Sequence, residues 1–181
     1  MDKLTQIAHL LITFASSIYI TIVMVRFLLQ LVRADFYNPL SQFVVKATNP
    51  LLMPLRKIIP GFFGIDFASL VLALLLQMAA LELLSLVING GLAPFLPVLL
   101  LATYKLLELL LNIYFFAFIV LVIVSWIAPH NHNPAISLLS SITEPVLAPI
   151  RRVLPPMGGL DFSVMVALLI IYILKILIGI G

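Results

Sequence analysis

Four long apolar runs set the strongest constraint on how this chain folds. They cover about residues 5–32, 67–88, 98–127 and 162–180. Each run is long enough to cross a hydrocarbon layer of about 30 Å as a helix, because a helix rises about 1.5 Å per residue. Lipid offers no partner to an unpaired backbone group, and the sequence lacks the alternating segments of a membrane barrel. The runs therefore predict four transmembrane helices.

The composition supports a membrane setting. Hydrophobic residues make up 64% of the chain and charged residues only 9%, whereas soluble domains carry about 25% charged residues. The 181 residues leave room for four spans and their connections, but not for a separate soluble domain. The first run is longer than a signal-peptide core and no A-x-A site follows it, so we interpret it as an uncleaved helix.

An internal repeat divides the chain into two similar halves. The matching positions, at a constant offset of 95 residues, are Asn38-Pro39 with Asn133-Pro134, Pro50 with Pro145, Pro54 with Pro149, Arg56-Lys57 with Arg151-Arg152, Pro60 with Pro155, and Asp66-Phe67 with Asp161-Phe162. We therefore predict an all-α membrane protein of two tandem two-span repeats, residues 1–93 and 94–181. A pseudo-two-fold axis along the membrane normal would relate them.

The distribution of cations predicts the topology. The long connections, residues 33–65 and 128–160, hold most of the basic residues: Arg33, Lys46, Arg56, Lys57, Arg151 and Arg152. Residues 89–97 carry no charge. The positive-inside rule therefore predicts that both long connections are cytoplasmic and both termini periplasmic.

Each long connection begins with the signature of a short amphipathic helix. Asn38 and Asn133 are predicted N-caps, because each is followed by a proline suited to the first helical position. The predicted apolar faces are Leu40, Phe43, Val44 and Ala47, and then Ala135, Leu138, Leu139 and Ile142, opposite polar faces that include Ser41, Thr48, Ser140 and Thr143. Such helices would lie in the membrane interface, with an ordinary packed loop helix as the alternative. Pro54 and Pro149 are expected to end these helices and start new ones.

The paired cations and the aspartates that follow them are the candidate site residues of the connections. Arg56, Lys57, Arg151 and Arg152 fit a segment that rests on anionic lipid headgroups, although topology signalling alone would also explain them. Asp66 and Asp161 precede apolar runs, where a carboxylate caps free N–H groups and complements the helix dipole. A catalytic or ion-binding role for these carboxylates is the alternative.

Polar residues inside the predicted spans form a second candidate set. Arg26 would extend to the cytoplasmic headgroups or pair with an acidic neighbour. Lys105 and Glu108 share one face of the third predicted helix, and Glu82 lies at a similar depth on the second. We interpret these residues, with Lys175 and Asn112, as a structural ion-pair network; a polar path for an ion or solute is the alternative.

Several function classes find no support in the sequence. The chain has no cysteine, which excludes disulfides and cysteine-bound metals. His130 and His132 form only a weak metal signal, and we predict neither a metal nor another cofactor. Nucleotide-binding, dinucleotide-binding and hydrolase motifs are missing, so we do not expect an enzyme. A basic soluble surface with stacking aromatics is also missing, so direct nucleic-acid binding is not expected.

The chain resembles a known family over nearly its whole length. Residues 35–46, the matching segments Pro50 to Pro60 and Pro145 to Pro155, and residues 157–162 are similar to the YggT family, also called YlmG, in its two-copy proteobacterial form. The resemblance implies a bacterial inner-membrane protein. Members are linked to cell-division or nucleoid organisation, to haem maturation in plastids, and to osmotic stress or cation homeostasis. The plastid haem role is not carried over, because no convincing haem ligand is present.

Two functional hypotheses follow from these observations. The first is a non-enzymatic membrane organising or assembly factor, whose basic segments bind anionic lipid and other membrane proteins. The second is a small transporter or channel component, in which Glu82, Lys105 and Glu108 face a shared polar path. Self-association into a homo-oligomer is compatible with either hypothesis.

Overall fold

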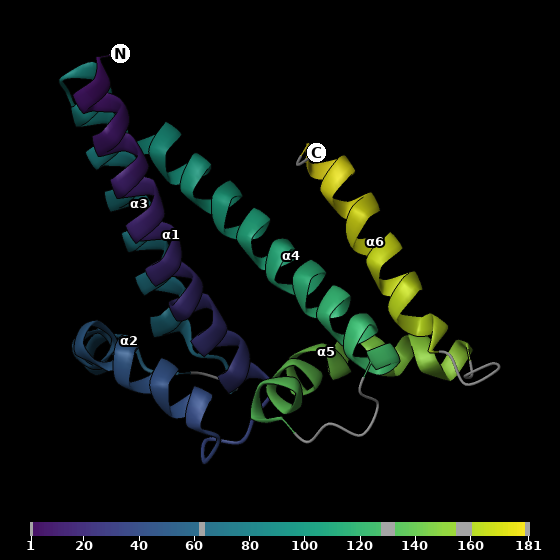
Figure 1. The fold of residues 1–181 in the computed structure, drawn as a ribbon. Coiled ribbons are helices and arrows are strands. Elements are labelled where there is room, and N and C mark those ends of the chain that lie inside the picture. The colour runs from purple at the N-terminus through teal and green to yellow at the C-terminus, as the bar shows by residue number, and fades with distance from the viewer. Residues whose placement is uncertain (1, 62–63, 128–132, 155–160, 180–181) are drawn as a thin grey trace.

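The computed structural model describes residues 2–61, 64–127, 133–154 and 161–179, and all regular secondary structure within these ranges is helical. Its six helices are α1 (Lys3–Leu31), α2 (Pro39–Ile58), α3 (Phe67–Asn89), α4 (Phe95–Ile127), α5 (Pro134–Val153) and α6 (Phe162–Ile178) (Figure 1). Helices α1, α3 and α4 are long and apolar enough to cross a membrane, and α6 is a shorter apolar helix of 17 residues. These features are those of an integral membrane protein.

The predicted capping residues occupy the N-termini of four helices. The Oδ1 of Asn38 accepts a hydrogen bond from the Leu40 N–H, at 2.9 Å, and Asn133 accepts from Ala135 at 2.8 Å. Asp66 and Asp161 likewise accept from backbone N–H groups in the first turns of α3 and α6. The side chains thus satisfy donors that a helix leaves unpaired at its start.

The four apolar helices run between two ends of the molecule, and the connecting helices gather at one of them. Helices α2 and α5 lie across the end where α1 and α4 finish, while both chain termini lie at the opposite end (Figure 1). Helices α2 and α5 meet through their N-termini, where the Asn38 Nδ2 donates to the Pro134 carbonyl at 2.8 Å. From there α2 runs to the start of α3, and α5 to the start of α6.

Three apolar clusters hold these helices together. One joins α1, α2 and α3 around Val23, Leu52 and Ala73, and a second joins α4, α5 and α6 around Phe118 and Leu147. The third, here called the central seam, connects the two halves and consists of Leu28, Leu29, Ala34, Val44, Leu138 and Ile142. The second cluster lies within one half, whereas the first also contains Leu106 of α4, so the two halves are joined by the first cluster as well as by the central seam.

The expectation that Pro54 and Pro149 would break the connecting helices is wrong. Helix α2 continues through Pro50 and Pro54, and α5 through Pro145 and Pro149. In each helix the two prolines are four residues apart, so they share one face, and all four side chains are exposed. The missing hydrogen bonds therefore fall on the outer side, where the freed carbonyls can find other partners and the helix can bend.

The packed faces of α2 and α5 also differ from the prediction. Ser41 and Thr48, which the apolar periodicity assigned to the polar face, are fully buried, whereas the side chain of Phe43 is exposed. Thr48 is accommodated because its hydroxyl donates to the Val44 carbonyl at 2.7 Å. Small hydroxyl residues can face a bundle when their own helix satisfies them, and this leaves larger apolar side chains on the outside.

Candidate functional site

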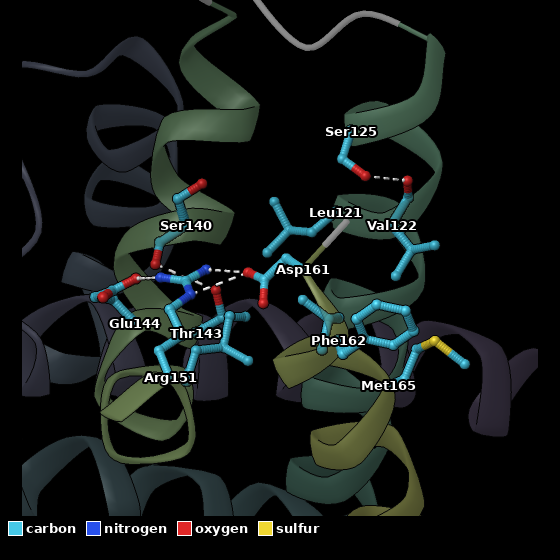
Figure 2. A pocket seen from close by; sticks show the side chains of 12 residues that line it. Leu121, Val122, Ser125, Ser140, Thr143, Glu144, Arg151, Asp161, Phe162 and Met165 are labelled. Carbon is cyan, nitrogen blue, oxygen red and sulfur yellow. Dashed lines mark hydrogen bonds and ion pairs between the residues drawn. The ribbon is translucent and has the colours of Figure 1, made fainter. Parts of the chain in front are cut away.

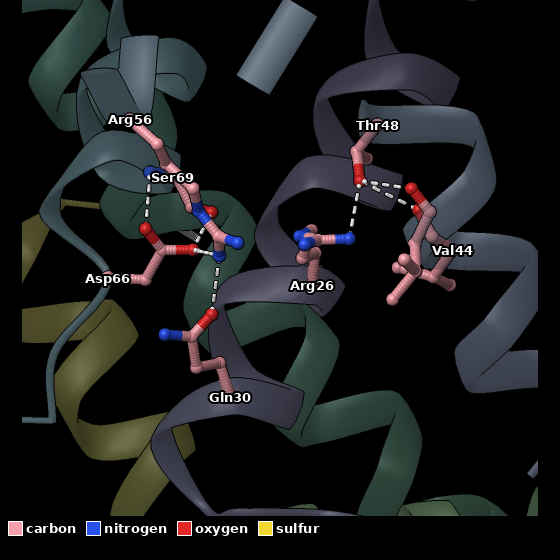
Figure 3. A network of polar contacts seen from close by, with 8 residues as sticks. Arg26, Gln30, Val44, Thr48, Arg56, Asp66 and Ser69 are labelled. Carbon is pink, nitrogen blue, oxygen red and sulfur yellow. Dashed lines mark hydrogen bonds and ion pairs between the residues drawn. The ribbon is translucent and has the colours of Figure 1, made fainter. Parts of the chain in front are cut away.

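An arginine–aspartate pair joins α2 to the start of α3 (Figure 3). The Arg56 Nη2 lies 2.5 Å from the Asp66 Oδ2 and also donates to the Gln30 Oε1 at 2.6 Å. Asp66 is only 3% exposed and also accepts from the Ser69 hydroxyl. Burial alone would raise the pKa of Asp66, but hydrogen bonds from Arg56 and Ser69 outweigh it, so the pKa lies below its usual value. The carboxylate is therefore charged and firmly held.

The second half contains the matching pair, in a more open setting (Figure 2). The Arg151 Nη2 lies 2.9 Å from the Asp161 Oδ2, and its Nη1 lies 2.6 Å from the Glu144 Oε2. Burial would raise the pKa of Asp161, but hydrogen bonds from Ser163 and Arg151 lower it overall. Its side chain is 35% exposed, so solvent weakens this pair more than the pair of the first half.

These pairs give Arg56 and Arg151 a structural role that the sequence analysis did not assign. Each guanidinium ties a connecting helix to the aspartate that caps the next apolar helix. The neighbouring cations, Lys57 and Arg152, are exposed, and they belong to none of the ion pairs found within the described ranges. Of the four predicted lipid-binding residues, these two are the ones whose charge faces outward.

Arg26 does not follow either interpretation drawn from the sequence. Its side chain is buried between α1 and α2, 7% exposed, rather than extended to the membrane surface. The Nη1 donates to the Thr48 Oγ1 at 3.2 Å, and no carboxylate of the described residues lies within ion-pair distance (Figure 3). Arg26 is nevertheless close enough to Arg56 and Asp66 to interact with their charges. It adds a cation to the interior of the first half.

The polar residues nearer the other end of the bundle form separate contacts instead of the predicted single network. Lys105 pairs with Glu108 at 3.0 Å, and the Lys175 Nζ donates to the Asn112 Oδ1 at 3.0 Å. Glu82 instead accepts from the Ala93 N–H at 3.1 Å and so stabilises the loop between α3 and α4. A hollow of about 430 Å³ between α1, α3 and α4 is lined by polar residues, including His9, Ser16, Gln77, Lys105, Glu108 and Asn112.

The exposed side of the connecting helices combines cations with apolar side chains. A shallow groove on α2 is lined by Lys46, Asn49, Pro50, Met53, Pro54 and Lys57. Large apolar side chains near it, Phe43 and Ile58, are exposed. On α5 the exposed Arg152 is followed by the exposed Val153. We call these exposed residues, Lys46, Met53 and Lys57 on α2 and Arg152 and Val153 on α5, the basic face; Lys57 and Arg152 lie at the outer ends of helices that meet through their N-termini.

Comparison with known proteins identifies the family. A model of the CCB3/YggT family matches residues 5–87 and 100–180. The chain belongs to this family. An uncharacterized protein of Pseudomonas aeruginosa is 50% identical over 163 residues, which cover 90% of this chain and 83% of the relative. The uncharacterized protein YggT of Escherichia coli K12 is 38% identical over 162 residues, covering 87% and 81%.

A relative from Vibrio alginolyticus extends the likeness over a similar length of chain. It is 38% identical over 170 residues, which cover 93% of this YggT-family chain and 91% of the relative. No solved structure gives a significant match. The curated relatives are named as uncharacterized proteins, so the family assignment does not bring a function with it.

Metal binding has no geometric support in the parts of the chain that the structure describes. Within those parts, no three histidine or acidic side chains lie close enough together to hold a metal ion. His130 and His132, which carried the weak metal signal, lie outside the described residues.

The first testable prediction concerns the buried carboxylate. Asp66→Asn should lower the free energy of unfolding by about 1–3 kcal/mol, because it leaves Arg56 without its anion in a partly buried site. Asparagine is as good an N-cap as aspartate, so the substitution isolates the charge from the cap. The measurement is the unfolding midpoint of the purified protein in mixed micelles.

Asp161→Asn is the matched control for this prediction, and its effect on the free energy of unfolding should be about 0–1 kcal/mol because the pair is exposed.

The pH dependence of stability follows from the lowered pKa of Asp66. The contribution of Asp66 to the free energy of unfolding is complete above the usual aspartate pKa and is lost as the pH falls through the folded-state value. Asp66→Asn should therefore reduce the acid sensitivity of stability. Equal effects of the two substitutions would contradict the assignment.

Proposed function

We propose that this YggT-family protein is a four-span inner-membrane protein built from two units, residues 1–93 and 94–181. In this arrangement α6 completes the fourth span, since its 17 residues, most of them apolar, reach the lower limit of about 17 for a crossing helix. Helices α2 and α5 then lie at the cytoplasmic surface and both termini in the periplasm. The clustering of α2 and α5 at one end, with the exposed cations, supports this placement.

The proposed function is that of a non-enzymatic organising or assembly factor that acts through the basic face. Lys46, Lys57 and Arg152 would contact anionic headgroups, and the neighbouring apolar side chains would enter the interface or contact a membrane-protein partner. The observation that carries this proposal is that the two cations of each pair have different surroundings. Arg56 and Arg151 are held by aspartates, whereas Lys57 and Arg152 face outward next to exposed apolar residues.

The lipid contact can be tested by neutralising the two outward cations. Lys57→Gln with Arg152→Gln should weaken binding of phosphatidylglycerol by about fivefold at each of the two sites, because each surface cation contributes about 1 kcal/mol and about 1.4 kcal/mol is tenfold. Native mass spectrometry of the purified protein, titrated with this lipid at two salt concentrations, would measure the effect.

A matched control removes the same charge from the opposite end of the bundle. Lys3→Gln with Lys105→Gln should leave the affinity nearly unchanged, because those lysines lie on the side of the chain termini. If both double variants lost affinity equally, binding would depend on net charge and the basic face would not be a lipid site.

The assembly role can be tested by photocrosslinking in living cells. A photoreactive residue at position 57 or 152 should capture the same discrete membrane proteins, and neutralising Lys46 should reduce the yield at position 57. The same residue at position 100, on an exposed part of α4 far from the basic face, should capture none of them. Capture of lipid alone at positions 57 and 152 would remove the assembly role.

A transporter or channel component is the second candidate function. The observation in its favour is the hollow of about 430 Å³ between α1, α3 and α4, which combines polar and apolar lining residues and at which Lys105 and Glu108 meet. Glu82 does not line it, which removes one of the residues first expected on such a path.

Flux through purified protein in liposomes discriminates this second candidate. If the hollow conducts, protein-containing liposomes should pass cations faster than empty ones, and Glu108→Gln should reduce the rate several-fold by removing a charged lining group. Glu82→Gln is the control, because Glu82 lies off the hollow. Flux equal to that of empty liposomes would exclude a conducting path.

A further inference from the structure

A cavity of about 360 Å³ in the second half has no role in the functions proposed above (Figure 2). It lies between the last turns of α4, the length of α5 and the first turn of α6. Its polar lining is Ser125, Ser140, Thr143, Glu144, Arg151 and Asp161, and its apolar lining includes Leu121, Leu147, Phe162 and Met165. Ligand sites usually measure about 300–1,000 Å³ and combine an apolar wall with a few convergent polar groups.

The repeat allows this cavity to be compared with the same place in the first half. At the offset of 95 residues, the counterparts of Leu121, Ser125 and Glu144 are Arg26, Gln30 and Asn49. In the first half the buried Arg26 extends to the hydroxyl of Thr48, and Gln30 accepts from Arg56 (Figure 3). Long polar side chains thus occupy the place that the shorter Leu121 and Ser125 leave open in the second half.

These differences between the two halves also change the net charge around the cavity. At this place the first half has two arginines, Arg26 and Arg56, and the carboxylate of Asp66. At the cavity the second half has one arginine, Arg151, and the carboxylates of Glu144 and Asp161, which it bridges at 2.6 and 2.9 Å. The cavity therefore lacks a cation where the first half has Arg26, and its charged lining residues carry one more negative than positive charge.

The hydroxyl of Thr143 is a further sign of a missing donor. Thr143 is 0% exposed and lines the cavity. It donates to the Leu139 carbonyl at 2.9 Å, but no donor among the described residues reaches its oxygen. Its counterpart, Thr48, accepts from the guanidinium of Arg26. The carboxylates of Glu144 and Asp161 are the acceptors open to a ligand, and a primary ammonium group carries three donors.

The position of the cavity indicates which class of cationic ligand fits it. It lies where α4 ends and α6 begins, which in the proposed four-span arrangement is the level of the lipid headgroups. The side chains of Glu144 and Asp161 are partly exposed, so the cavity is open to entry from outside. Its apolar wall fits the glycerol and upper acyl region of a lipid whose head carries the cation.

We propose that this cavity binds the ammonium headgroup of a phospholipid with a primary amine, such as phosphatidylethanolamine. The ammonium supplies the positive charge that Arg26 supplies in the first half, and it donates to the exposed carboxylates of Glu144 and Asp161. This site uses other residues and another class of lipid than the basic face.

Native mass spectrometry of the full-length protein, titrated separately with phosphatidylethanolamine and phosphatidylcholine, tests the proposal. We expect phosphatidylethanolamine to bind more tightly by about tenfold or more, because the trimethylated head of phosphatidylcholine has no N–H to donate. Glu144→Gln should weaken phosphatidylethanolamine binding by about 10- to 100-fold, since it removes a charged acceptor. Equal binding of the two lipids would overturn the proposal.

Leu121→Arg provides an independent test that reproduces the first half. The new guanidinium should fill the cavity and abolish the preference for phosphatidylethanolamine, and the unfolding midpoint should not fall, which separates occupancy from misfolding. A retained preference in a folded Leu121→Arg protein would overturn the site. Phosphoethanolamine, which has the head but no acyl chains, should compete poorly; full competition would overturn the lipid assignment in favour of a soluble amine.

Lipid binding at the basic face and lipid binding in the cavity can be tested independently of each other. Lys57→Gln with Arg152→Gln should leave the preference for phosphatidylethanolamine intact, and Leu121→Arg should leave phosphatidylglycerol binding intact. Loss of the preference in the Lys57 and Arg152 variant would show that the ammonium lipid binds at the basic face and not in the cavity.

Discussion

The ion pair between Arg56 and Asp66 is the contact on which the connecting helices depend. Asp66 caps α3 and at the same time binds the guanidinium at the end of α2, so one carboxylate fixes where two helices stop and start. The same contact occurs in both halves, and in each the arginine and the aspartate are ten residues apart. Because each pair fixes the C-terminal end of α2 or α5, it also determines which faces of those helices remain outside. The outward direction of Lys57 and Arg152 is a consequence of the inward direction of their neighbours.

Much of the helical framework could be predicted from the sequence. Apolar length marks the long helices, because lipid leaves a spanning segment no other conformation. The dipeptides Asn38-Pro39 and Asn133-Pro134 mark the starts of α2 and α5, because capping and the fixed backbone of proline are local effects. The expected family is shown by the match to the CCB3/YggT model. These features depend on near neighbours or on composition, which a sequence displays directly.

The candidate site was less predictable because its contacts join separate elements. Arg56 and Asp66 were recognised individually, but periodicity does not relate residues on either side of a helix break. The burial of Thr48 does not follow from side-chain polarity, because its own helix satisfies the hydroxyl through the Val44 carbonyl. The fixed offset between the halves was the available signal for the pairs, since it matched Arg56 with Arg151 and Asp66 with Asp161 at once.

The central seam has a consequence for how such a unit can exist alone. Leu28, Leu29 and Val44 of one half are covered by Leu138 and Ile142 of the other. A chain that carried a single unit would present this apolar surface to lipid or water at the membrane boundary, together with the unpaired N-terminus of its connecting helix. Two such chains could cover each other's apolar surface in the same way. Duplication in one chain therefore amounts to a dimer whose subunits cannot separate, and it leaves each half free to diverge, as Arg26 and Leu121 have done.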